Sequence, residues 1–219
     1  MGEMLVIRHG QASFGAGDAA DYDNLSEQGS RQSELAGAAL RAAGWVPDRL
    51  VTGTLRRQKE TLAAMGFGDD PETHAGLNEY DFYDLLQTRF DGKVPDQVRR
   101  DRKTHFRTLR EVIYDWQAGG LDGARESWLA FVDRVEAARA FAAGGDARRV
   151  LVVSSGGVIG QMVAAALDAP ARQMVALNLQ IKNTSMTRFI FSGDRFTLNE
   201  FNATPHFADQ TNAAFMTYS

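Results

Sequence analysis

The sequence contains no cysteine among its 219 residues. This absence excludes disulfide bonds, thiolate metal sites and a cysteine nucleophile. Histidine is nearly as rare, and the four that occur are scattered along the chain: His9, His74, His105 and His206. Because a metal site needs clustered ligands, we expect neither a metal nor another cofactor.

The sequence also lacks a large charge of one sign and a long hydrophobic run. The formal net charge is -4, which does not favour binding to nucleic acid or to an anionic membrane. No apolar run approaches the length of a transmembrane helix, and the first residues lack the basic segment and cleavage site of a secretory signal. We therefore expect a soluble cytoplasmic protein without nucleic-acid or membrane partners. The oligomeric state stays open, with a homodimer among the alternatives.

What the sequence does contain is enough apolar material for one sizeable core. Hydrophobic residues make up 44% of the chain, and we see no repeat, low-complexity tract or linker. Residues 1–219 are therefore predicted to form a single domain.

Short apolar runs alternate with helical patterns. Three runs resemble strands buried on both faces, and each precedes a helical pattern: residues 4–7, 49–52 and 150–153. This alternation predicts an α/β fold with three layers (α/β/α) and a mostly parallel sheet. Near the end, residues 185–191 and 195–201 alternate on either side of Ser192-Gly193-Asp194, which predicts a hairpin of antiparallel edge strands.

The middle of the chain is mainly helical. Residues 75–82 form a weaker extended pattern, and residues 84–143 form a helical insertion that we expect to act as a lid. Apolar residues between Val98 and Trp116 suggest one helix, and those from Trp128 onward suggest another. The first part is rich in polar cationic groups that could reach an acidic substrate but are more typical of solvated helix faces: Arg89, Arg99, Arg100, Lys103, His105 and Arg107.

Three polar loops follow the predicted strands, and the carboxyl ends of parallel strands share one edge of a sheet. The loops are Arg8-His9-Gly10, residues 53–57, and Ser154-Ser155-Gly156-Gly157. Together they offer an imidazole, at least two guanidinium groups and a helix N-terminus, which suit a dianionic phosphoryl group. His9 is the side chain placed to act as a nitrogen nucleophile.

The order of several motifs points to a known family. The segments "VIRHG", "LSEQG", "LRRQKET", "LNE" and "VVSSGG" follow one another across nearly the whole chain. This set resembles the histidine phosphatase superfamily, and within it the branch that includes phosphoglycerate mutase. The resemblance implies that His9 takes the phosphoryl group as phosphohistidine, while Arg8 and Arg57 clamp the phosphate.

The resemblance also implies roles in the other two loops. Glu79, in "LNE", matches the acid that protonates the leaving group, and Asp81 is the alternative acid, although its simpler interpretation is a turn residue. Ser155 and Gly156 match the second phosphate-binding loop. Asn183-Thr184-Ser185 resembles a late segment that supports the floor of the pocket.

The sequence departs from the family pattern in three places. Ser155 stands where the family usually has a second histidine, and Gly53 stands where a serine often precedes the clamp arginine. Residues 12–15 replace a common Thr-x-x-Asn segment. A neutral hydroxyl binds phosphate about half as strongly as a protonated imidazole, so Ser155 is expected to slow or re-tune the enzyme rather than to abolish its activity.

These observations predict a phosphomonoester hydrolase that acts on a small phosphorylated substrate through His9. The alternative is a weak or inactive module that binds a phosphorylated ligand, and a mutase is a third interpretation. Ser155 as a nucleophile is disfavoured because Val153 stands where a nucleophile elbow needs glycine. A dinucleotide-binding site is disfavoured as well, because its glycine fingerprint would require glycine at position 155.

Overall fold

The computed structural model describes residues 1–13, 23–68 and 70–218. Part of the departure at residues 12–15 therefore lies outside the described residues. The described residues form a six-stranded sheet in the order β3-β2-β4-β1-β5-β6. The strands, in chain order, are β1 (Gly2–Arg8), β2 (Arg49–Thr52), β3 (Glu72–Thr73), β4 (Arg149–Ser154), β5 (Met186–Ser192) and β6 (Arg195–Ala203). β1 to β4 are parallel, and β5 and β6 are antiparallel, as predicted.

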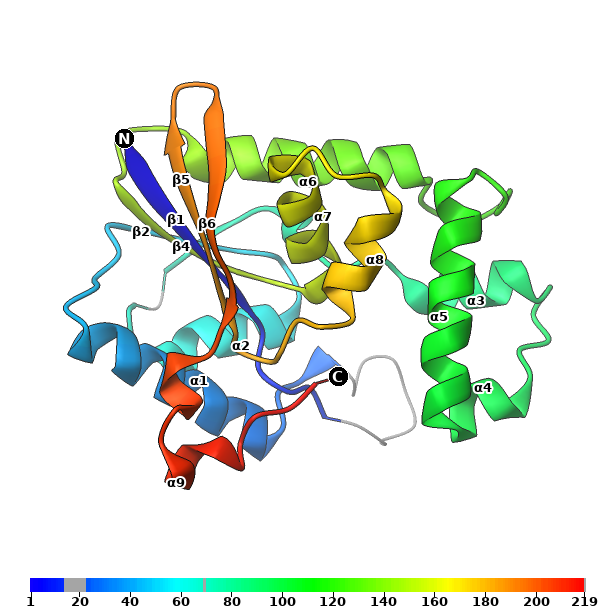
Figure 1. Ribbon diagram of the computed structural model, residues 1–219, viewed down its shortest axis with the longest axis horizontal. Coiled ribbons are helices and arrows are strands. Elements are labelled where there is room, and N and C mark those ends of the chain that lie inside the picture. The colour runs from blue at the N-terminus through cyan, green and yellow to red at the C-terminus, as the bar shows by residue number, and fades with distance from the viewer. Residues whose placement is uncertain (14–22, 69, 219) are drawn as a thin grey trace.

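Helices cover both faces of the sheet, which confirms the predicted three-layer fold (Figure 1). The helices over the sheet are α1 (Glu27–Ala42), α2 (Arg56–Met65), α6 (Trp128–Ala143), α7 (Gly156–Ala166) and α8 (Arg172–Asn178). β1 shows why both faces are apolar. Met4 and Val6 pack in the core under α6 and α7, while Leu5 and Ile7 pack in the core under α1 and α2. A strand buried on both sides needs such an unbroken apolar run.

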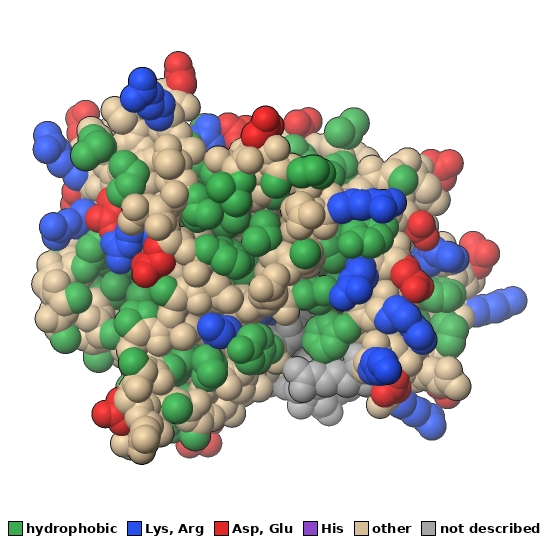
Figure 2. All heavy atoms as spheres, in the orientation of Figure 1, with side chains coloured by type: hydrophobic (Ala, Val, Ile, Leu, Met, Phe, Trp, Pro, Cys, Tyr) green, Lys and Arg blue, Asp and Glu red, His purple; other side chains and the backbone are tan. Residues whose placement is uncertain are grey.

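The middle of the chain forms two groups of helices. α3 (Phe82–Arg89), α4 (Asp96–Arg100) and α5 (Arg102–Gln117) lie together at one end of the molecule, on the right in Figure 1, whereas α6 lies along the sheet. The two ends of this first group are joined, because the backbone N–H of Arg125 donates to Oδ2 of Asp84 at 2.8 Å. The group also contacts the start of α8, where Nε2 of Gln117 donates to the Ala171 carbonyl at 2.8 Å. Lys and Arg side chains gather over α4 and α5 in Figure 2.

Two predictions for this region are wrong in detail. The extended pattern at residues 75–82 is a 3₁₀ turn, η2 (Ala75–Leu77), followed by the start of α3, because His74 and Asp81 accept bonds from backbone N–H groups and cap the two turns. The single helix expected from Val98 to Trp116 is divided between α4 and α5. Asp101 causes the division, because it caps α5 by accepting from the N–H of Thr104 at 2.8 Å.

The last part of the chain returns to the sheet and then crosses to α1. The hairpin places β5 inside the sheet, beside β1, and β6 at the edge. η3 (Pro205–Phe207) and α9 (Gln210–Ala213) follow, and the side chain of Gln32 on α1 donates to the carbonyl of Phe215. No helix in the described parts of the chain is long and apolar enough to cross a membrane.

Candidate active site

The loops after β1 and β4 lie side by side at the carboxyl edge of the sheet. The strands pair in parallel register, with Arg8 opposite Ser154, and the backbone N–H of His9 donates to the Ser154 carbonyl at 2.9 Å. The loop before α2 joins the same edge, where Gly53 N–H faces the Val153 carbonyl at 3.4 Å. The structure therefore brings the three predicted loops together.

His9 is buried and is held in a single tautomer. Its Nδ1 lies 2.8 Å from the carbonyl oxygen of Gly10, which can only accept, so Nδ1 carries the hydrogen. Its Nε2 accepts from Nε of Arg57 at 3.2 Å, and a guanidinium can only donate. Nε2 is thus the atom with the lone pair. Burial, and then the charges of Arg57 and Arg8, hold the pKa of His9 well below its usual value, so the ring is neutral at neutral pH.

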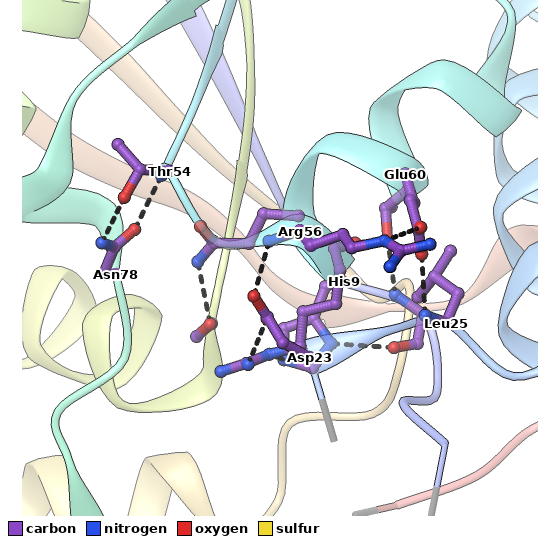
Figure 3. A network of polar contacts seen from close by, with 12 residues as sticks. His9, Asp23, Leu25, Thr54, Arg56, Glu60 and Asn78 are labelled. Carbon is purple, nitrogen blue, oxygen red and sulfur yellow. Dashed lines mark hydrogen bonds and ion pairs between the residues drawn. The ribbon is translucent and has the colours of Figure 1, made fainter. Parts of the chain in front are cut away.

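Arg56 and Arg57 begin the same helix but have different surroundings. Arg57 is buried, and its Nη1 pairs with Oδ1 of Asp23 at 2.8 Å. The side chain of Arg56 is 66% exposed and pairs with Glu60 at 2.6 Å. Figure 3 shows Asp23 pointing at the start of α2, where its Oδ2 accepts from the backbone N–H of Arg56 at 2.9 Å. Of the two arginines, Arg57 is therefore the one that faces His9.

Arg8 and His9 rest on the segment that precedes β5. Nη1 of the buried Arg8 donates to the Ile181 carbonyl. The Asn183 amide donates to the His9 carbonyl at 3.2 Å, and the Thr184 N–H donates to the Arg8 carbonyl at 3.1 Å. Thr184 has a φ of 55°, an uncommon value for a residue other than glycine. This segment lies beneath the β1 loop, where a supporting role was expected.

Ser155 and the two glycines after it form the start of α7. Ser155 is fully buried, and its Oγ accepts from Nε2 of Gln58 at 2.9 Å. A Cβ on Gly156 would lie 2.4 Å from Oδ1 of Asn178, and a Cβ on Gly157 would lie 2.3 Å from Oε1 of Glu79. A side chain at either position would force its neighbour to shift. Gly156 also lies beside the guanidinium of Arg8, since its added Cβ would be 3.6 Å from Cζ.

The Glu79 side chain is bound to the start of α7, the helix that follows the β4 loop. Its Oε2 accepts from the Gly157 N–H at 3.0 Å, and its Oε1 accepts from the Tyr80 N–H at 3.2 Å. These bonds and the charges of Arg57 and Arg8 favour the carboxylate, but burial has the larger effect and raises the pKa of Glu79 above its usual value. Such a carboxyl group can hold a proton closer to neutral pH.

The segment that carries Glu79 is fixed by α6 and by Thr54. Arg134 of α6 donates through Nη1 to the carbonyls of Gly76, at 3.0 Å, and Asn78, at 2.7 Å. The Asn78 side chain exchanges two bonds with Thr54, of 2.8 and 2.7 Å (Figure 3). The segment that carries Glu79 is thus held by α6 through Arg134 and by the loop before α2 through Thr54.

Asp81, the alternative acid, does not join this cluster. Its side chain is 52% exposed, caps α3 by accepting from the Asp84 N–H at 3.0 Å, and faces Arg125 at 3.5 Å. Among the described residues, no three His, Asp or Glu side chains are grouped so that they could hold a metal ion. The chemical groups gathered at the site are one neutral imidazole, two guanidiniums, a protonatable carboxyl and the amides of α7.

Comparison with known proteins agrees with this arrangement. The model of the histidine phosphatase superfamily (branch 1) matches residues 4–204. The chain belongs to the histidine phosphatase superfamily. No curated protein matches the chain.

Solved structures of other histidine phosphatases share the fold. A mycobacterial glucosyl-3-phosphoglycerate phosphatase in complex with VO3 is 27% identical, with a TM-score of 0.64 over 93% of this chain and 100% of that chain. The alpha-ribazole phosphatase from Shigella flexneri is 19% identical, with a TM-score of 0.65 over 92% of this chain and 96% of that chain. A phosphoserine phosphatase from Entamoeba histolytica is 18% identical, with a TM-score of 0.65 over 94% and 99%.

Two residues of this superfamily member were not found by sequence reasoning. Gln58 follows Arg57 and contacts Ser155, but a glutamine on a helix carries no signal of its orientation. Asp23 pairs with Arg57, yet it stands in a polar loop with no pattern that distinguishes it from neighbouring acids. Both depend on tertiary placement of a side chain.

Proposed function

We propose that the protein hydrolyses phosphomonoesters through a phosphohistidine formed on Nε2 of His9. The observation that carries this proposal is the tautomer of His9, whose lone pair on Nε2 faces the guanidinium of Arg57. A neutral imidazole next to bound cations is the form that can attack phosphorus. Membership of the histidine phosphatase superfamily supports the same reaction.

In the first step, Nε2 of His9 attacks the phosphorus atom while the bond from phosphorus to the ester oxygen breaks. Arg8, Arg57 and the amides at the start of α7 neutralise the charge on the non-bridging oxygens. Glu79 gives its proton to the departing oxygen, so an alcohol leaves. The raised pKa of Glu79 makes this proton available near neutral pH.

In the second step, a water molecule attacks the phosphohistidine. The Glu79 carboxylate takes a proton from this water, the bond from phosphorus to Nε2 breaks, and inorganic phosphate leaves. His9 returns to its neutral form, and Glu79 is protonated again. Apart from the substrate and water, the proposed cycle uses only side chains and backbone amides of this chain.

We propose a small phosphorylated molecule as the substrate, and a cytoplasmic enzyme. The chain resembles phosphatases whose names refer to small phosphate esters, including a glucosyl-3-phosphoglycerate phosphatase that is 27% identical. Residues 84–143 are proposed to contribute a lid, with α3, α4 and α5 as its outer part. Turnover of a panel of phosphomonoesters would identify the preferred ester.

The test is to trap the intermediate with a ³²P-labelled phosphomonoester. We expect acid-labile label on His9, no label after His9→Asn, and normal label after His105→Asn, a control histidine in the insertion. Saturable binding of phosphate esters without label or turnover would replace the enzyme by a binding module. Transfer of label to a second hydroxyl of the substrate, rather than to water, would indicate a mutase.

A further inference from the structure

A fully buried glutamine connects α2 to the loop after β4. Nε2 of Gln58 donates to Oγ of Ser155 at 2.9 Å and to the carbonyl of Leu77 at 2.8 Å. The Leu77 carbonyl can only accept, so the end of the amide that faces it must be the nitrogen. The orientation of the Gln58 amide is therefore fixed, and Ser155 receives a hydrogen from it.

This arrangement determines what the Ser155 hydroxyl can do. Because its oxygen accepts from Gln58, its own hydrogen is directed elsewhere. The nearby Leu77 carbonyl already accepts from Gln58 and from the Ser154 hydroxyl, which lies 2.8 Å away. The contacts among described residues give the Ser155 hydrogen no acceptor. The next residue, Gly156, packs beside the guanidinium of Arg8.

Gly53 makes room for this amide. A Cβ on Gly53 would lie 1.9 Å from Oε1 of Gln58 and 2.6 Å from Oδ1 of Asn78, so any side chain there would displace the glutamine. Gly53 and Ser155 are two of the positions at which the sequence departs from the residues usual in its family. Gln58 is the side chain that links them.

We propose that Gly53, Gln58 and Ser155 form one unit, in which Gln58 is a positioning residue that orients the Ser155 hydroxyl as a hydrogen-bond donor to the transferring phosphoryl group. This inference rests on the proposed function, because it names the part that takes the place of a second imidazole. The donor is neutral at every pH at which the enzyme works. The charge on the phosphoryl group is then balanced by Arg8 and Arg57.

The first test is a double-mutant cycle with p-nitrophenyl phosphate. Gln58→Met keeps the volume of the side chain but removes the amide, and Ser155→Ala removes the hydroxyl. Each is expected to lower kcat on the order of 10²-fold with a smaller change in KM, and the double variant is expected to lose no more than either single variant. Gln161→Met, the same exchange on α7, is the control and is expected to keep kcat.

The second test restores an imidazole. Ser155→His alone places the ring against the Gln58 amide, so we expect no gain in kcat. Ser155→His with Gln58→Ala removes the obstacle, and we expect a higher kcat than Ser155→Ala together with a new alkaline limb in the pH profile, near the ordinary imidazole pKa of about 6.5. An equal gain in kcat from Ser155→His with Gln58 left in place would contradict the contact on which the proposal depends.

Additive losses in the cycle, or an unchanged kcat after Gln58→Met, would overturn the proposal. Failure of the proposed function is a separate outcome, because wild type would then neither turn over nor take the label. In that case the affinity for inorganic phosphate replaces kcat as the readout. Equal weakening by Gln58→Met, Ser155→Ala and the double variant would support the unit, and unchanged affinity would refute it.

Discussion

The loops after β1 and β4 occupy matching places and carry different chemistry. The two strands are parallel neighbours with Arg8 opposite Ser154, so His9 and Ser155 follow at equivalent positions. His9 lies between an acceptor, the Gly10 carbonyl, and a donor, Arg57, which together fix its lone pair on Nε2. Ser155 lies against a donor, Gln58, which leaves a hydrogen. In the proposed mechanism, one backbone arrangement thus presents a nucleophile in one loop and a hydrogen-bond donor in the other, according to the side chains that surround it.

Removing the imidazole from the β1 loop is expected to have the largest effect on activity. His9→Asn keeps a polar group of similar size but offers no nucleophilic nitrogen, so we expect kcat to fall on the order of 10⁴-fold or more. Steady-state turnover of p-nitrophenyl phosphate measures this change. Thermal melting serves as the control, and a variant that folds normally and still turns over at the wild-type rate would refute the nucleophile.

The two arginines of α2 provide the next contrast. Arg57 contacts His9 and is buried, whereas Arg56 is largely exposed and pairs with Glu60. Arg57→Ala should lower kcat on the order of 10²- to 10³-fold, because it removes donors aimed at the phosphoryl oxygens. Arg56→Ala is the matched variant and should change kcat by less than about twofold, since exposed ion pairs contribute little. Equal losses in both variants would show that the helix charge, rather than contact with His9, matters.

Glu79 accepts from the start of α7, and its replacement tests the acid. Glu79→Gln should lower kcat for an alkyl phosphate on the order of 10²-fold and lower it less for p-nitrophenyl phosphate, whose leaving group needs no proton. Burial raises the Glu79 pKa, so wild-type activity should fall as pH rises through that value and the acid loses its proton. Glu79→Gln should lack this alkaline limb. Measuring kcat over a pH series tests whether the limb is lost. The control is Asp81→Asn, which alters an exposed helix cap and should keep the limb.

The smallest effect on activity is expected at His206, beneath the β1 loop. Its Nε2 lies 3.0 Å from Oγ1 of Thr184, and burial lowers its pKa from 6.5 to about 4. Because the unfolded chain binds a proton at a higher pH than the folded chain does, stability present above about pH 6.5 is lost as the pH falls toward about 4. Each unit of pKa corresponds to about 1.4 kcal/mol, so this loss is on the order of 3 kcal/mol.

Urea unfolding at about pH 7 and about pH 4 measures this loss. His206→Gln should remove that part of the pH dependence while kcat at neutral pH stays near the wild-type value. The lowered pKa of His9 acts in the same direction, so some acid destabilisation should persist in the variant. Identical pH dependence in both proteins would contradict the effect of burial on His206.

The sequence was sufficient for the sheet and for the groups at its edge. Apolar runs predict β1, β2 and β4, and their ends bring His9 and Arg57 together because parallel strands share a carboxyl edge. The sequence was not sufficient where a single polar side chain determines a helix boundary or a contact in the site. Asp101 divides one apolar pattern into two helices by capping α5, and both helices still place apolar residues in one core. Similarly, "LRRQ" suggests neither that Arg56 is exposed nor that Gln58 reaches Ser155.

The joined ends of the segment that carries α3, α4 and α5 have a consequence for protein engineering. Because the Arg125 N–H is bonded to Asp84, the chain from Asp84 to Arg125 forms a loop whose two ends are already joined by a hydrogen bond. Closing such a segment with a different set of residues has little additional entropic cost. We therefore expect that exchanging α3, α4 and α5 between relatives, with the contact of Gln117 to Ala171 kept, changes the ester that is recognised, while Arg134 keeps the segment of Glu79 in place.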